Sequence, residues 1–288
     1  MNIRTSSTNA AQIEYWNSDA AANWVRHADG LDFMLREVGD RLLARAELRH
    51  GDRVVDVGCG SGAITLAAQD RVGDAGRAIG LDISRALILE ARRRAADVGS
   101  QATFIETDAA TWRDETQADA VISRLGVMFF DNPIAAFANM LHSARPGGRL
   151  DFVCWCSPKE SDMGSGLMKA VSALFEKPNT PADPTAPGPY AFADQDRVRV
   201  ILTDAGWQDV NVDLWEGFLP LPGHDVSECA AFAANIGAIA RLMREQNVAL
   251  ERVVDALVPF LERRMHNGRI ALRGLAWFVS AHKSRRAT

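Results

Sequence analysis

Short runs of β-branched residues alternate with longer runs rich in alanine, leucine and arginine from about residue 51 onward. This alternation is typical of βαβ units, which build a parallel sheet covered by helices. We therefore predict an α/β fold with strands at 53–57, 77–81, 102–105, 118–123 and 149–155. The intervening helices are predicted at 61–71, 84–98 and 133–143. The sequence RPGG at 145–148 is expected to form the turn between the last of these helices and the fifth strand.

The regions outside this alternation have other patterns. Apolar residues recur at helical spacing over about 10–46, and a stretch rich in proline and glycine, with a short helical piece near 167–175, follows the fifth strand. The alternation resumes with a helix at 195–205, a strand within 205–215 and a last strand at 275–283, and a helical insertion at 219–268 interrupts it. The predicted organisation is a helical cap at 1–50, a core at 51–156 that continues at 195–216, two cap insertions at 157–194 and 217–270, and a final strand and tail at 271–288.

Composition narrows the class of protein. A chain of 288 residues, 47% of them hydrophobic, can bury a full core. The formal charge of −5 argues against a nucleic-acid groove, which needs a concentrated basic surface. No apolar run approaches the ~20 residues that cross a bilayer, the first residues lack the apolar core of a signal peptide, and the four cysteines show no disulfide framework. We expect a cytoplasmic protein with neither a nucleic acid nor a membrane as partner; a homodimer is compatible with the sequence.

The sequence VVDVGCGSGA at 54–63 fits two different cofactor loops. Its glycines and Ala63 satisfy the dinucleotide pattern G-x-G-x-x-[GA], whereas the run from Asp56 to Gly62 spells D-x-G-x-G-x-G, a loop for S-adenosylmethionine. Asp56 ends a predicted strand, and at about 5 Å with an effective dielectric near 20 one charge pair contributes about 3 kcal/mol. A carboxylate here repels a pyrophosphate and attracts the ammonium group of S-adenosylmethionine. The loop therefore favours S-adenosylmethionine over a nicotinamide cofactor.

Two more acids follow the next two predicted strands. Asp82 can accept hydrogen bonds from both ribose hydroxyls of either cofactor. Asp108 is more selective, because it can accept from the adenine amino group while the backbone N–H of Ala109 meets the ring. Carboxyl ends of neighbouring parallel strands meet at one edge of a sheet, so these acids are expected to surround one ligand. Each acid taken alone is equally compatible with a helix cap.

The motifs VVDVGCGSG, GLDIS, TDAA, AVISRLGVMFFDNP and RPGGRLDFVCW resemble the ordered motifs of class I S-adenosylmethionine-dependent methyltransferases. They are most similar to the small-molecule group related to the ubiquinone and menaquinone C-methyltransferases, over about residues 50–156. The sequence departs from that pattern at Leu125, where relatives often have an aromatic residue, and at Asp151, where a small apolar residue is common.

This resemblance implies a doubly wound, seven-stranded and mostly parallel sheet of the Rossmann-like methyltransferase type, with an antiparallel last strand. It also implies N-terminal helices that fold over the cofactor and a helical cap built from the two insertions. The implied cofactor contacts are Asp56, Gly58, Cys59, Gly60, Asp82, Ile83, Asp108, Ala109, Ser123 through its backbone carbonyl, and Tyr15.

The reaction implied is the in-line displacement of a methyl group from a sulfonium to an oxygen, nitrogen or carbon atom. Orientation supplies roughly 7–11 kcal/mol of such a barrier, and a general base is needed only for a protonated acceptor. The turn that marks nucleobase and glutamine methylation is absent, because Ser123-Arg124-Leu125-Gly126 stands in its place. We expect a medium-sized, partly apolar small molecule as acceptor. A peptide or protein acceptor, or a cofactor-binding protein of this fold that does not methylate, are the alternatives.

The acceptor pocket is expected among aromatic and apolar side chains, since aromatic faces suit a sulfonium. The candidates are Trp16, Arg124, Met128, Phe129, Trp155, Tyr190 and Phe192. Core packing is the alternative for Met128, Phe129 and Trp155, and a structural salt bridge is the alternative for Arg124. Candidate bases are His27, His266 and Tyr15, against the alternative of surface or structural histidines. No pair of histidines has metal-ligand spacing, and no metal is expected.

Overall fold

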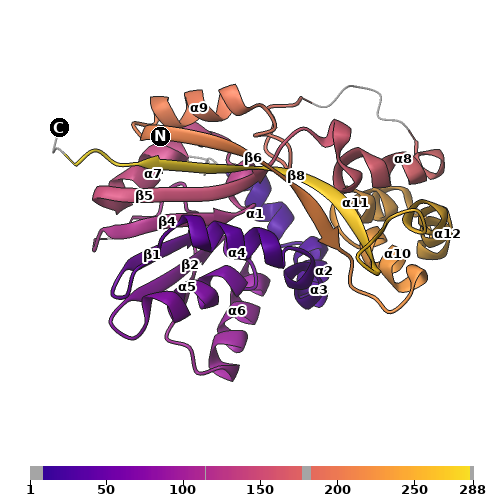
Figure 1. Ribbon diagram of the computed structural model, residues 1–288, viewed down its shortest axis with the longest axis horizontal. Coiled ribbons are helices and arrows are strands. Elements are labelled where there is room, and N and C mark those ends of the chain that lie inside the picture. Colours follow the sequence, from indigo (N-terminus) through magenta and orange to yellow (C-terminus); the bar gives the residue numbers. More distant parts are fainter. Residues whose placement is uncertain (1–8, 114, 177–182, 286–288) are drawn as a thin grey trace, which may run out of the picture.

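The computed structural model describes residues 9–113, 115–176 and 183–285. In this part of the chain, seven strands follow the order β3-β2-β1-β4-β5-β8-β6, and the short β7 pairs with β8 (Figure 1). The strands from β3 to β5 in this order run parallel to one another, whereas β8 is antiparallel to both β5 and β6. The strands are β1 (Arg53–Val57), β2 (Arg77–Asp82), β3 (Thr103–Glu106), β4 (Ala118–Arg124), β5 (Ala144–Trp155), β6 (Gln208–Pro220), β7 (Met265–His266) and β8 (Arg269–His282).

Helices cover both faces of the sheet, because successive side chains of a strand point to opposite sides. On β1, Val54 packs in the cluster that includes α4 and α5, whereas Val55 packs in the cluster that includes α7 and α9. The predicted doubly wound sheet with an antiparallel last strand is therefore confirmed. The helices that cover it are α4 (Arg36–Arg45), α5 (Ala63–Val72), α6 (Arg85–Asp97), α7 (Pro133–Ser143) and α9 (Gln195–Asp204).

The remaining helices gather at one end of the sheet (Figure 1). Most of their buried apolar side chains and those of α4 and α5 belong to one hydrophobic cluster, whose members range from Leu31 to Phe278. A 3₁₀ turn (Pro158–Glu160) and a π-helical turn (Asp162–Gly166) lead into α8. The helices of this end are α1 (Ala10–Trp16), α2 (Asp19–Arg26), α3 (Ala28–Met34), α8 (Leu167–Val171), α10 (Val226–Ala234), α11 (Gly237–Gln246) and α12 (Leu250–Leu261).

The RPGG sequence does not separate a helix from a strand. The strand β5 begins already at Ala144, directly after α7, and pairs there with Ala118. The ladder then breaks, so that Ala120 pairs with Arg149, and Gly147 takes the left-handed value φ 76°. The extra residues therefore form a bulge inside β5, and the predicted turn was wrong.

The helical insertion is also shorter than predicted, because both flanking strands are longer. Trp155 at the end of β5 pairs with Ala276, but β6 and β8 continue as a two-stranded ribbon in which 216–220 pair with 271–275. We call this segment the β6–β8 ribbon. Its buried Leu219 and Leu272 carry the apolar alternation onward beyond the sheet. The cap helices α10, α11 and α12 lie between the two strands in sequence.

Part of the proline-rich stretch, 177–182, lies outside the described residues. The boundaries predicted for the cap and core segments stay predictions. In the described part of the chain no single helix has both the length and the apolar character needed to cross a bilayer; α10 and α11, bent by 71°, meet those criteria only as a pair.

Candidate active site

A cavity of about 620 Å³ opens at the carboxyl ends of the parallel strands. Its walls come from the loops after β1 to β5 and from the helices of the cap. Most of the lining is apolar. Among the described residues, the charged side chains on the lining are Asp32, Asp56, Asp82, Asp108, Arg124 and Lys169. The cavity therefore combines a polar edge with an apolar chamber, as small-molecule sites commonly do.

The glycine loop closes tightly on the sheet. Gly58 and Gly60 have φ values of 67° and 55°, in the left-handed region that favours glycine. A Cβ atom on Gly58 would lie 2.7 Å from the Cα of Gly126, so the loop approaches the end of β4 too closely for any side chain. The backbone N–H groups of Gly58 and Cys59 both donate to the carbonyl of Leu81, at 2.8 and 3.0 Å. These contacts fix the loop between β2 and β4.

Asp56 carries a buried carboxylate with one unpartnered oxygen. Its Oδ2 accepts a hydrogen bond from the hydroxyl of Thr65 at 2.7 Å, and among the described residues its buried Oδ1 has no partner. Burial raises the pKa of Asp56 to about 6, although the Thr65 hydrogen bond and the charge of Arg124 lower it. At neutral pH this group is an acceptor for a cationic donor at the edge of the cavity.

Asp82 orients the glycine loop as well as facing the cavity. One carboxylate oxygen accepts from the N–H of Gly60 at 2.9 Å, and the other accepts from the N–H of Ser84 at 2.8 Å. Burial raises the pKa of Asp82, and these backbone hydrogen bonds lower it. Each oxygen keeps a further lone pair, so the carboxylate can also accept from a ligand hydroxyl.

Asp108 is held by an asparagine that the sequence did not single out. The side-chain nitrogen of Asn9 donates to both carboxylate oxygens of Asp108, at 2.9 and 3.0 Å, and its oxygen accepts from the N–H of Asp131 at 2.9 Å. At the other end of α1, Asn17 donates to the carbonyl of Ile83 and accepts from the N–H of the first residue of α6. This N-terminal strap, residues 9–17, is therefore fastened at both ends across the cavity edge.

Most of the predicted acceptor residues lie together on the cavity wall: Trp16, Arg124, Met128, Phe129, Trp155 and Tyr190. The ring of Trp16 packs edge-on against Trp24 and Phe129, at centroid distances of 5.5 and 5.6 Å. Burial raises the pKa of Tyr190 to about 12, so its hydroxyl stays protonated near neutral pH and can donate a hydrogen bond.

Two of the predicted cofactor contacts do not line the cavity. Tyr15 packs its ring edge-on against Trp16, with centroids 5.3 Å apart, and only the tryptophan faces the cavity. Ser123 is fully buried, and its hydroxyl donates to the carbonyl of Val57 at 2.6 Å, which ties β4 to β1. The other predicted contacts, Asp56, Gly58, Cys59, Gly60, Asp82, Ile83, Asp108 and Ala109, all lie on the lining.

The remaining candidates, Phe192, His27 and His266, do not line the cavity. Phe192 packs with Phe137 and Phe152 in the core between the sheet and α7, not in the cavity. His27 contacts the carbonyl of Asn23 through Nδ1, and the ring of His266 stacks on Phe218 with centroids 3.8 Å apart. No described histidine lines the cavity, so the placement of His27 and His266 argues against their assignment as bases.

Several lining residues were missed because they come from the cap. Trp24 and Asp32 belong to α2 and α3, and apolar residues of α8, α11 and the turns beside them complete the chamber. Helical periodicity indicated that these segments have an apolar side, but it does not specify which element that side contacts. Asn9 stands before α1 without any pattern that distinguishes it.

Residues 54–148 match the model of a methyltransferase domain family. A trans-aconitate 2-methyltransferase from Escherichia coli is 29% identical over 188 residues, which cover 64% of this chain and 67% of that protein. The aklanonic acid methyltransferase DauC from a Streptomyces species is 33% identical over 125 residues, or 43% of this chain and 56% of that protein.

The chain is a class I S-adenosylmethionine-dependent methyltransferase. The solved structure of YcgJ from Bacillus subtilis shares the fold of this methyltransferase, with a TM-score of 0.56, 14% identity and coverage of 86% of this chain and 99% of that one. The family match and the two named methyltransferases confirm the predicted enzyme class and, with it, the predicted cofactor.

The site fits S-adenosylmethionine in two respects. The unpartnered oxygen of Asp56 suits the cofactor's ammonium group, because a buried acceptor without a donor is costly. Gly60 borders open space, since a Cβ atom placed on it would meet nothing within 4 Å. The loop of this methyltransferase thus leaves room for a ligand at the point where its acid lacks a partner.

The cofactor affinity of this methyltransferase should rise as pH increases through about 6. The pKa of Asp56 lies near 6 in the free protein, and only its ionised form attracts an ammonium group. The ionised fraction grows about tenfold from pH 5 to pH 7, so the dissociation constant of S-adenosylhomocysteine should fall by about that factor. Calorimetric titrations at pH 5, 6, 7 and 8 measure this dissociation constant.

The variant Asp56→Asn should bind S-adenosylhomocysteine more weakly and with a dissociation constant that does not change with pH. A dissociation constant that still falls with rising pH in this variant would refute the assignment.

Proposed function

We propose that this methyltransferase transfers the methyl group of S-adenosylmethionine to a medium-sized, partly apolar small molecule held beneath the helical cap. One observation carries the proposal: the glycine loop and an apolar chamber walled by α2, α3, α8 and α11 border the same cavity. A chamber of this kind suits an enclosed metabolite better than a peptide, which needs an open groove. The relatives named above are named for trans-aconitate and aklanonic acid, both of which are small molecules.

The chain's own residues bind and orient the two reactants. When bound, the cofactor supplies a methyl group that is activated by a positively charged sulfur. We assign Asp56 to the ammonium group, Asp82 to the ribose and Asp108 to the adenine edge of the cofactor. Trp16, Phe129 and other aromatic side chains on the lining can favour positive charge through their faces. We propose that the cap shields the bound reactants from water, which strengthens each of these electrostatic contacts.

General-base catalysis is not assigned to any residue. The four lining aspartates already accept hydrogen bonds or ion pairs from neighbouring groups. Tyr190 stays protonated near neutral pH and is assigned as a hydrogen-bond donor to the acceptor molecule. We therefore propose that positioning dominates catalysis, with an acceptor whose nucleophile is available without proton removal by the protein.

The test is to follow tritium from methyl-labelled S-adenosylmethionine into a library of small-molecule acids, phenols and amines, and in parallel into a peptide and protein mixture. We expect label in small molecules that can be extracted from the quenched reaction. Label confined to peptides or protein would contradict the small-molecule assignment. Absence of transfer to any acceptor, with cofactor binding intact, would contradict methyl transfer itself.

A further inference from the structure

Arg124 places a positive charge on the cavity wall. It is the last residue of β4, the strand that lies between β1 with Asp56 and β5 with Trp155. Its side chain is 15% exposed, and it lines the cavity. The other basic side chain on the described lining, Lys169, is exposed to solvent at the edge. Arg124 is thus the inner cation of the chamber.

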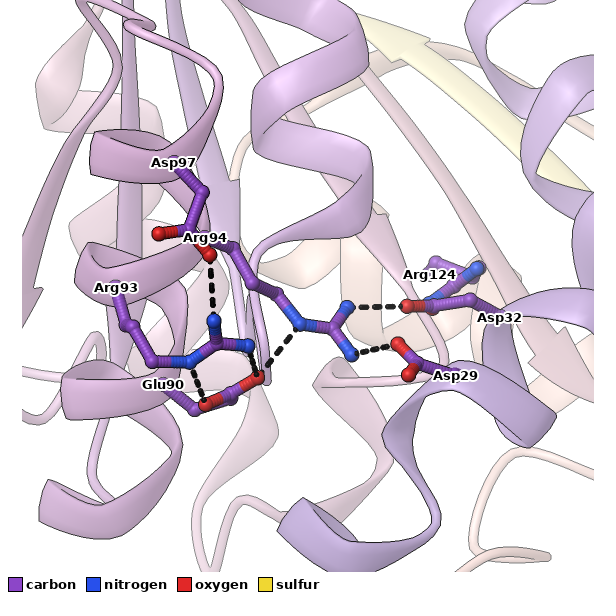
Figure 2. Close-up of polar contacts among 7 residues, drawn as sticks. All are labelled: Asp29, Asp32, Glu90, Arg93, Arg94, Asp97 and Arg124. Carbon is purple, nitrogen blue, oxygen red and sulfur yellow. Dashed lines mark hydrogen bonds and ion pairs between the residues drawn. The ribbon is translucent and has the colours of Figure 1, made fainter.

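A network of ion pairs that begins at Asp32 holds the guanidinium group of Arg124 (Figure 2). Asp32 of α3 accepts from Nη2 of Arg124 through one oxygen and from Nη1 of Arg94 through the other, both at 2.7 Å. Arg94 of α6 also pairs with Asp29 and Glu90, at 2.6 and 2.9 Å. Asp32 is therefore shared by two guanidinium groups and is fixed in orientation by the one that lies outside the cavity.

Arg124 keeps donors for a further partner. Its hydrogen bond to Asp32 uses Nη2, and no other hydrogen bond from its guanidinium occurs among the described residues. Asp56 at the end of the neighbouring strand is assigned to the ammonium group of the cofactor, so its charge is compensated once the cofactor is bound. Arg124 then faces an apolar chamber, and the one carboxylate that pairs with it, that of Asp32, also pairs with Arg94. A partly buried cation is costly in such surroundings unless an anion pairs with it.

We propose that Arg124 binds a carboxylate of the acceptor molecule and that Asp32 and Arg94 are positioning residues for it. The inference rests on the function proposed above and narrows its substrate class to organic acids with an apolar body. A guanidinium matches a carboxylate with two parallel N–H donors, which gives orientation as well as affinity. This contact would place the apolar body of the acid in the chamber lined by the cap.

The test uses 2-naphthoate and 2-naphthamide, which share an apolar body and differ in charge. Binding of each to the 288-residue protein saturated with S-adenosylhomocysteine is measured by calorimetry. Tryptophan fluorescence gives a second readout, because Trp16, Trp24 and Trp155 line the cavity. We expect the wild-type protein to bind naphthoate about tenfold or more tightly than naphthamide, the gain typical of a charge-assisted hydrogen bond. In Arg124→Gln this preference should vanish, and in Arg124→Lys part of it should remain.

Arg93→Gln is the matched control, because it removes the same charge from the same network. Arg93 pairs with Glu90 and Asp97, is 59% exposed and does not line the cavity (Figure 2). This variant should keep the wild-type preference, and Arg94→Gln should reduce the preference without abolishing it.

Three results would overturn the inference: equal binding of the two probes by the wild-type protein, a preference that survives in Arg124→Gln, or no binding of either probe. Binding of S-adenosylhomocysteine is measured on the same samples and shows that each variant is folded. Equal binding of the two probes by a wild-type enzyme that methylates other small molecules would remove the acid assignment and leave the proposed function intact.

Discussion

Asp82→Ala should weaken the binding of S-adenosylhomocysteine by about a hundredfold. The substitution removes the ribose acceptor and also the partner of two backbone N–H groups, those of Gly60 and Ser84. Hydrogen bonds to a charged group contribute about 1.5–3 kcal/mol each, so the loss of one or two of them to the ligand accounts for this factor. Calorimetric titration of the purified variant gives the dissociation constant.

Glu106→Ala is the control for this experiment. Glu106 ends β3 directly opposite Asp82 in the parallel ladder, but its side chain is exposed and does not line the cavity. Removing this carboxylate should leave the affinity within a factor of two. An affinity equally close to wild type in Asp82→Ala would show that the acid does not contact the cofactor.

Asp151→Asn should stabilise the protein, most strongly at alkaline pH. Asp151 lies on β5 with 3% exposure, and its carboxylate accepts no hydrogen bond among the described residues. Burial raises its pKa from 3.8 to about 7, although the charges of Arg149 and Arg45 lower it. The unfolded chain releases this proton near pH 4 and the folded chain near pH 7. Asp151 therefore does not destabilise the folded protein below about pH 4. As pH rises from 4 to 7, the free energy of unfolding falls because only the unfolded chain releases the proton.

The size of this effect follows from the pKa difference. Relative to an unperturbed carboxyl, the raised pKa lowers the free energy of unfolding by about 4 kcal/mol at pH 8.5 and by about 2 kcal/mol at pH 5.5. The gain in unfolding free energy for Asp151→Asn should accordingly be about 2 kcal/mol larger at the higher pH. Urea unfolding at both pH values measures it. Asp204→Asn, the same change at an exposed position on α9, should alter stability by no more than about 0.5 kcal/mol. A gain that does not depend on pH would exclude this explanation.

The acids of the cofactor site were predictable because they depend on local sequence and on one rule of topology. Each of Asp56, Asp82 and Asp108 follows a run of strand-forming residues, and parallel strands bring their carboxyl ends to one edge. Strand β1 was predicted with its observed bounds for the same reason. The hydrophobic alternation that specifies a buried strand also specifies where that strand ends.

The partners of those acids were not predictable in this way. Asn9 reaches Asp108 across 99 positions of sequence, and Asp32 reaches Arg124 across 92. Such contacts depend on how the N-terminal helices pack against the sheet edge, and periodicity gives the apolar side of a helix without its neighbour. The same limit explains His27 and His266, whose positions in cap segments suggested a catalytic role that their packing does not support.

The β6–β8 ribbon determines which wall of the chamber can open. Backbone hydrogen bonds join its two strands from the sheet out to the pair Pro220–Ala271, so a continuous ladder carries the segment with α10 to α12 away from the core. The wall formed by α1 and α2 is attached through asparagine side chains such as Asn9 and Asn17. Side-chain contacts break at far lower cost than a continuous ladder. We therefore expect reactants and products to enter and leave beside α1 and α2, while the β6–β8 ribbon and its helices stay in place.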